Sequence, residues 1–150
     1  MKIDNASWHF GGDYPNDLPD KNAYTHIGFF LKWCLLNDFA SEELKEISGD
    51  DIEKVLQGTM SGADFLEINC DGKFCDDDLT EKGNEFAEDY YSTDDGDFVK
   101  KFKSYYEDLA EVFSEPETIY HVENTEENYA LIARRINERY NQWLDFANQL

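Results

Sequence analysis

The chain is poor in basic residues, in cysteine and in long hydrophobic runs. Its 13 lysines and arginines stand against 34 aspartates and glutamates, which gives a formal net charge of -21 at pH 7. A protein with this charge repels nucleic-acid phosphates and anionic lipid headgroups. We therefore expect no binding of nucleic acid or of a membrane surface, and we expect a cationic partner such as a basic protein.

The scarcity of cysteine and of apolar runs indicates where such a chain works. Three cysteines, Cys34, Cys70 and Cys75, cannot all pair within one chain, and their spacing does not outline a disulfide framework. No hydrophobic run reaches the length of a membrane-spanning helix, and residues 1–5 lack the apolar segment of a signal peptide. We therefore expect a soluble protein of a reducing compartment, the cytoplasm.

Aromatic side chains, in contrast, are abundant. Phenylalanine, tyrosine and tryptophan make up 15% of the 150 residues, which is enough apolar area to drive folding despite the charge. The length suits one domain covering residues 1–150. Apolar residues recur at helical spacing in most segments, including a long stripe over residues 98–113. The expected fold class is a single compact, mostly α multi-helix domain.

A small β element is expected beside the helices. Residues 118–122 alternate in a β-prone way, which makes them the best strand candidate in the chain. Residues 3–10 can form a second, short extended segment that leads into a glycine turn. The two segments can pair with each other.

The most distinctive stretch lies near the N-terminus. Residues 8–15 (Trp-His-Phe-Gly-Gly-Asp-Tyr-Pro) begin a turn-rich loop that extends to Pro19. The helix that follows is apolar almost all round, so it must be buried, with the loop of residues 8–19 as its lid. His26 on that helix fits a hydrogen-bonded core histidine better than a ligand. Asp13 can act as a base or can hold the turn through backbone amides. The candidate residues of a ligand loop are Trp8, His9, Asp13 and His26.

The acidic residues are concentrated in the middle of the chain. Residues 41–97 hold 19 acids against four lysines, a balance of -15, while the rest of the chain accounts for -6. Helices of this segment that pack side by side would present a strongly negative face, which steers a basic protein towards it while aromatic side chains anchor the contact. The residues predicted to bind this partner are Asp50, Asp51, Asp76, Asp77, Asp78, Asp94, Asp95 and Asp97.

No motif indicates metal, cofactor or covalent chemistry. The acids at residues 76–78 lack the alternate spacing and central glycine of a calcium loop, and Cys70 and Cys75 lack a second pair of zinc ligands. No nucleophile elbow or phosphate-binding loop is present. We expect no metal ion, no cofactor and no enzymatic activity. The alternative is a small enzyme or ligand-binding protein that uses residues 8–13 and His26.

Several segments together resemble an uncharacterised family of small acidic bacterial proteins. They are residues 8–15, residues 25–33 (Thr-His-Ile-Gly-Phe-Phe-Leu-Lys-Trp), residues 70–74 and residues 120–125. Members of this family look like the small proteins encoded beside secreted bacterial toxins. The resemblance implies an immunity role by association and carries over no catalytic or binding residue. We therefore expect a protein that binds and neutralises a cognate basic toxin effector by stoichiometric inhibition.

Overall fold

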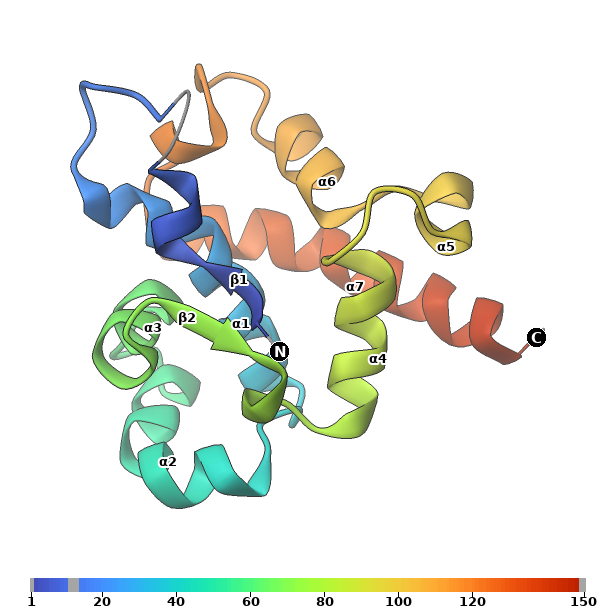
Figure 1. Cartoon of the computed structure of the whole chain (residues 1–150), viewed down its shortest axis with the longest axis horizontal. Helices are drawn as coiled ribbons and strands as arrows, with labels where there is room; N and C mark the ends of the chain where they lie inside the picture. Colours follow the sequence, from blue (N-terminus) through green and yellow to red (C-terminus); the bar gives the residue numbers. More distant parts are fainter. Residues whose placement is uncertain (1, 11–13, 149–150) are drawn as a thin grey trace.

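Helix α1, residues Thr25–Leu36, lies at the centre of the fold (Figure 1). The computed structural model describes residues 2–10 and 14–148. Every residue from Thr25 to Leu35 is buried, which confirms that this apolar helix belongs to the core. Helices α2, α3 and α7 contact it. Together with a small two-stranded sheet they form a mostly α-helical domain, as the composition and periodicity predict.

Most of the α-helices begin at a serine or threonine that caps the first turn. In each case the side-chain oxygen accepts a hydrogen bond from a backbone N–H in that turn, which the helix itself cannot satisfy. The capping residues are Ser41, Ser61, Thr80, Ser104 and Thr125. The helices after α1 are α2 (Glu42–Leu56), α3 (Gly62–Cys70), α4 (Glu81–Tyr90), α5 (Asp97–Lys101), α6 (Tyr105–Val112) and α7 (Glu126–Asn148). Short 3-10 helices are η1 (Ala6–His9), η2 (Asp20–Tyr24), η3 (Asp76–Asp78) and η4 (Ile119–His121).

Helices α1 and α3 cross backbone to backbone. A Cβ atom at Gly28 would lie 2.2 Å from the backbone nitrogen of Ala63, and a Cβ atom at Gly62 would lie 1.9 Å from the carbonyl oxygen of Gly28. No side chain fits at either position, because real Cβ atoms do not approach other atoms this closely. The two glycines therefore fix α1 against α3.

The sheet pairs the N-terminus with the segment after α3. Strand β1 (Lys2–Asn5) runs antiparallel to β2 (Lys73–Cys75). Residues 71 and 72 reverse the chain between α3 and β2, since both adopt positive φ angles of 52° and 76°. An Asp-Gly pair is a strong turn signal, which accounts for the reversal at this place. β1 covers only the beginning of the segment 3–10 that was expected to be extended, because Ala6–His9 form the 3-10 helix η1. The expected pairing of this segment with residues 118–122 is wrong, since β1 pairs with β2.

The prediction that residues 118–122 form a strand is wrong, because this segment contains the 3-10 helix η4. The side chain of Thr118 accepts a hydrogen bond from the backbone N–H of Tyr120 at 3.1 Å. The carbonyl of Thr118 accepts one from the N–H of His121, also at 3.1 Å. A threonine side chain that hydrogen-bonds the backbone two residues later favours a turn over the backbone pairing of a β-sheet. This local preference outweighs the alternating pattern of residues 118–122.

The apolar stripe over residues 98–113 forms two helices, α5 and α6, instead of one. Ser104 Oγ accepts a hydrogen bond from the N–H of Glu107 at 3.2 Å, and the carboxylate of Glu107 accepts one from the N–H of Ser104 at 3.1 Å. This reciprocal capping box starts a new helix at Tyr105. It sets the direction of α6, whose Tyr106 reaches β1.

Aromatic rings fill the space around α1. The ring centroid of Phe30 lies 5.0 Å from that of Tyr91 and 5.3 Å from that of Tyr105. The ring centroids of Trp33 and Phe86 lie 5.4 Å apart. The abundance of aromatic residues is therefore mainly a property of the core. Among the helices of the described residues, none combines the length and the apolar character needed to cross a membrane.

Candidate functional site

A buried carboxylate, that of Asp4 on β1, lies at the centre of a polar cluster. Asp4 is only 3% exposed. Its Oδ1 accepts hydrogen bonds from the backbone N–H of Asn5 at 2.7 Å and from Nε2 of His9 at 2.9 Å. Its Oδ2 accepts hydrogen bonds from the hydroxyls of Tyr91 and Tyr106, both at 2.5 Å. The carboxylate is therefore held in one orientation by four donors.

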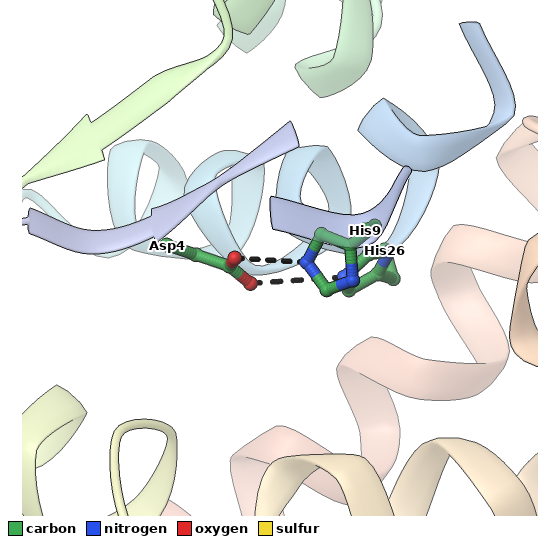
Figure 2. A group of neighbouring side chains, drawn as sticks. All are labelled: Asp4, His9 and His26. Atoms are coloured by element: carbon green, nitrogen blue, oxygen red, sulfur yellow. Dashed lines mark hydrogen bonds and ion pairs between the residues drawn. The ribbon is translucent and has the colours of Figure 1, made fainter. Parts of the chain in front are cut away.

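Two histidines from different elements meet at this carboxylate, as Figure 2 shows. His9 lies on η1, and His26 lies in the first turn of α1; their ring centroids are 4.6 Å apart. Nε2 of His26 lies 3.7 Å from Oδ2 of Asp4 and 3.2 Å from the hydroxyl of Tyr106. Nδ1 of His9 contacts the hydroxyl of Tyr120 at 2.7 Å. We name these residues the Asp4 cluster: Asp4, His9, His26, Tyr91, Tyr106 and Tyr120.

Burial and mutual contact set the protonation states in the Asp4 cluster. Burial raises the pKa of Asp4, but the polar and charge interactions with His26 and His9 outweigh it and hold that pKa far below its usual value. Burial lowers the pKa of His26, against the opposing effect of Asp4. Burial, together with the charge of Asp4, raises the pKa of Tyr106 far above its usual value. At neutral pH the cluster therefore contains an ionised carboxylate, and its tyrosines act as donors.

Aromatic side chains line the approach to His9, whose side chain is 13% exposed. The rings of Tyr14 and Tyr120 lie 4.9 Å apart, and Phe10 lies 5.4 Å from Tyr14. Trp8, the neighbour of His9 in sequence, is 56% exposed. We define the aromatic rim as the aromatic side chains on and beside η1 that are at least partly exposed, which are Trp8, Phe10, Tyr14 and Tyr120.

The structure brings together only part of the predicted ligand loop. His9 and His26 are in contact, Trp8 lies on the aromatic rim, and Asp13 lies outside the described residues. Sequence reasoning missed the other members of the cluster, which are Asp4, Tyr91, Tyr106 and Tyr120. The one available signal was the pairs of adjacent tyrosines at residues 90–91 and 105–106. The hydroxyl of a buried tyrosine needs a hydrogen-bond partner, so these pairs could have indicated a buried polar group.

The predicted acidic residues fall into two groups. The first group comprises Asp76, Asp77 and Asp78 on η3, which lies at the start of α2, and Asp50 and Asp51, which lie further along α2 beyond its kink. The acids at residues 94–97 lie just before and at the start of α5, which Figure 1 shows on the other side of the molecule from α2. We use the term acidic surface for the acids of the first group and of α2 beside it, which are Glu42, Glu43, Glu46, Asp50, Asp51, Asp76, Asp77 and Asp78.

Some of these carboxylates have local structural roles. Asp78 accepts a backbone hydrogen bond that starts η3, and burial raises its pKa. Asp51 accepts a hydrogen bond from the side-chain amide of Asn69 on α3 at 3.0 Å. Asp50 and Asp77 are exposed to solvent. The exposed pair is therefore better suited to meet a partner than Asp51 or Asp78.

A hollow of about 400 Å³ opens in the acidic surface where α2 is kinked. The kink lies at Ser48, whose φ of -127° and ψ of 22° are not helical. Ile47 lines the hollow and is 74% exposed, and Ile68 of the neighbouring helix α3 is 64% exposed. Ile47 thus places an apolar side chain beside the charged residues that line the hollow. The hollow is lined by Lys45, Glu46, Ile47, Ser48, Gly49, Asp50, Asp51 and Asn69.

A family model described as a domain of unknown function (DUF7832) matches residues 2–122. The match includes α1, the Asp4 cluster and the acidic surface, and it ends before α7. No curated protein and no solved structure matches the chain.

Proposed function

The chain belongs to this family of unknown function, and we propose that it is an immunity-type protein that binds a basic toxin effector and blocks it stoichiometrically. A toxin that acts on an anionic substrate such as nucleic acid has a basic cleft, and an acidic inhibitor can cover that cleft. The acidic surface is the part of the chain proposed to make this contact. The bacterial cytoplasm is the proposed place of action.

The hollow at the kink of α2 is the observation that carries this proposal. Lysines or arginines of a basic partner would pair with Glu46 and Asp50, while apolar side chains of the partner would cover Ile47. The hydroxyl of Ser48 is buried and has no hydrogen-bond partner among the described residues, so it can serve a polar group that enters the hollow. The site thus offers charge, apolar area and a polar contact together.

The charge of the whole chain supports the same kind of partner. With a net charge of -21, the protein attracts a basic protein from a distance, and such steering raises association rates by one or more orders of magnitude at low salt. The effect falls as the ionic strength rises, because salt screens exposed charges beyond about 10 Å. Association that depends on salt is therefore expected.

The test compares two double variants with the same change in net charge. The first, Glu46→Lys with Asp50→Lys, reverses the charge at the hollow. The matched control, Asp94→Lys with Asp97→Lys, reverses two exposed acids beside α5. A basic partner is recovered from bacterial lysate with the unaltered protein, and its binding kinetics are then measured with each variant. We expect the first variant to slow association at least tenfold at low salt and the control to change it less than about threefold.

Two outcomes would contradict the proposal. Equal slowing by both variants would show that total charge, not the acidic surface, governs association. Failure of the recovered partner to arrest bacterial growth, or failure of this chain to relieve that arrest on co-expression, would remove the immunity role even if binding were tight. Ile47→Ala gives an independent readout, because loss of an apolar anchor raises the dissociation rate.

A second candidate function, in ligand binding or catalysis, is favoured by the chain of contacts from Tyr120 through His9 to Asp4. An imidazole held between a carboxylate and a hydroxyl has the arrangement of a general base that activates the hydroxyl. This role predicts that His9→Gln keeps the fold and the partner binding but loses the activity. Loss of the native circular dichroism spectrum in His9→Gln would instead indicate that the contacts serve the fold.

A further inference from the structure

Asp4, His9 and His26 place three ligand atoms for a metal ion within 4.8 Å of one another. One carboxylate and two imidazoles form a donor set that binds zinc and related divalent metals, usually with a coordination position left for water. The three residues come from β1, η1 and α1, and Figure 2 shows both rings beside the two oxygens of the same carboxylate. The arrangement therefore depends on the fold and not on a local motif.

We propose that Asp4, His9 and His26 together bind a divalent first-row transition-metal ion, such as Zn²⁺, beneath the aromatic rim. Nε2 of His9 and Nε2 of His26 lie 2.9 Å and 3.7 Å from the oxygens of Asp4. Ligand atoms of a tetrahedral zinc ion with bonds of about 2.0–2.1 Å are separated by roughly 3.3 Å, so small side-chain movements suffice. On binding, the proton that Nε2 of His9 donates to Asp4 would move to Nδ1, which would donate it to the hydroxyl oxygen of Tyr120, so that Nε2 becomes free for the metal.

The lack of a fixed positive charge at Asp4 supports a cation site. Asp108, the other deeply buried carboxylate of this kind, pairs with Arg135 and Arg139, each at 2.9 Å. Among residues 2–10 and 14–148, the ion-pair partners of Asp4 are histidines alone. The charge of a histidine depends on its protonation, whereas an arginine carries a fixed charge. A divalent ion would supply at Asp4 what the arginines supply at Asp108.

The hydrogen bonding of His26 is incomplete in either neutral form. Its Nδ1 is buried and has no hydrogen-bond partner within the described part of the chain. If Nδ1 carries the proton, the lone pair of Nε2 points towards oxygens of Tyr106 and Asp4, and the hydroxyl proton of Tyr106 is already donated to Asp4. A metal ion at Nε2 would give that lone pair the partner that the protein does not supply.

Groups behind two of the three ligands, His9 and Asp4, hold them as outer-shell partners do in known metal sites. The hydroxyl of Tyr120 contacts Nδ1 of His9, which fixes the ring and leaves Nε2 for the metal. The hydroxyls of Tyr91 and Tyr106 hold Oδ2 of Asp4. These contacts keep the ligands in place before a metal arrives, which lowers the cost of ordering them on binding.

Zinc-binding side chains elsewhere in the chain must be controlled for in the experiment. Cys70 and Cys75 lie close enough to influence each other, and burial raises the pKa of Cys70 to about 12, so its thiol stays protonated in the folded state. Thiolates nevertheless bind zinc strongly once formed, so both cysteines are replaced by serine in all samples. His121 serves as the matched control, because it also pairs with a carboxylate but lies nearer the surface. Its Nε2 lies 3.2 Å from Oδ2 of Asp17.

The experiment titrates the metal-free full chain with Zn²⁺ in a calorimeter, and repeats it with Co²⁺ to follow visible absorption. We expect one Zn²⁺ per chain, a loss of affinity of at least 100-fold in His9→Ala and Asp4→Asn, and a change below about threefold in His121→Ala. Circular dichroism of each metal-free variant shows whether the fold persists. Tyr120→Phe keeps all three ligands but loses the contact to Nδ1 of His9. We therefore expect this variant to bind Zn²⁺ about tenfold more weakly than the parent protein.

Absence of stoichiometric Zn²⁺ binding by the parent protein would overturn the proposal. The same holds if His121→Ala loses as much affinity as His9→Ala, or if His9→Ala binds as tightly as the parent. Should His9→Ala and Asp4→Asn fail to fold, unchanged affinity in Tyr120→Phe would overturn it, whereas a tenfold loss there would support it.

Discussion

The hydroxyl of Tyr106 donates a hydrogen bond of 2.5 Å to Oδ2 of Asp4, across 102 residues of sequence. Tyr91, just past the end of α4, donates to the same oxygen. One carboxylate on the first strand therefore ties together β1, α6 and the end of α4. Changes at this carboxylate or its donors should affect stability and any activity of the Asp4 cluster together.

Tyr106→Phe should lower the free energy of unfolding by about 1.5–3 kcal/mol, because it removes a buried donor to a charged acceptor. Urea unfolding followed by circular dichroism measures the loss. Tyr14→Phe is the control, since its hydroxyl donates to the carbonyl of Pro19 at an exposed position, and it should cost less than about 1 kcal/mol. Equal losses in the two variants would show that the carboxylate gives Tyr106 no special role.

Stability should fall as the pH drops below about 6.5, the usual pKa of an unfolded histidine. Burial lowers the pKa of His26 in the folded protein, so below that pH the unfolded chain binds more protons than the folded one. The contribution of His26 is thus present above pH 6.5 and is lost as the pH falls. The lowered pKa of Asp4 adds a second loss, below about pH 4.

Urea unfolding at pH 7.5 and pH 5.0, in a buffer with a chelator, tests this dependence. His26→Gln should show a smaller difference between the two pH values than the unaltered protein. A difference of the same size in both proteins would assign the dependence to other groups.

Gly28→Ala should destabilise the protein by at least about 2–3 kcal/mol or prevent folding, because its Cβ would overlap the backbone of α3. Gly49→Ala is the matched control in α2, where a Cβ meets nothing within 4 Å. Alanine is the better helix former, so this variant should gain about 0.5–1 kcal/mol. Thermal and urea unfolding give both values. Similar behaviour of the two variants would contradict the close helix crossing.

Arg139→Met should cost about 3 kcal/mol, since it leaves the buried Asp108 with one arginine instead of two. Arg134 is exposed on the same helix, and Arg134→Met should change the free energy of unfolding by less than about 0.5 kcal/mol. Urea unfolding at neutral pH measures both. If the two variants were equally stable, the ion pair between Arg139 and Asp108 would make no net contribution to the free energy of unfolding.

Local features of the fold could be predicted because their causes are local. Helix α1 is apolar on every side, which only a buried position allows. Ser61 caps α3 by accepting the N–H of Asp64, and both residues are visible as a pair three apart. The turn at residues 71–72 follows from a glycine next to an aspartate.

Long-range features could not be predicted, because the residues that make them lie far apart in the sequence. Strand β2 has only the residues Lys73–Cys75, too few to show a period of two, so the partner of β1 was not visible. Asp4 stands in no motif, and its three side-chain donors lie 5, 87 and 102 residues away along the chain. His9 and His26 were candidates because of their types and neighbours, but only the fold shows that they share a carboxylate.

The pairing of β1 with distant parts of the chain has a consequence for biosynthesis. A ribosome adds about 5–20 residues per second, so Asp4 leaves it roughly 5–20 seconds before Tyr106. Strand β2 leaves the ribosome within that interval, so the sheet can form first, but the carboxylate of Asp4 still lacks its donor Tyr106. The Asp4 cluster forms only after most of the protein has been translated, so a ribosome that stalls before residue 106 produces a chain without this site.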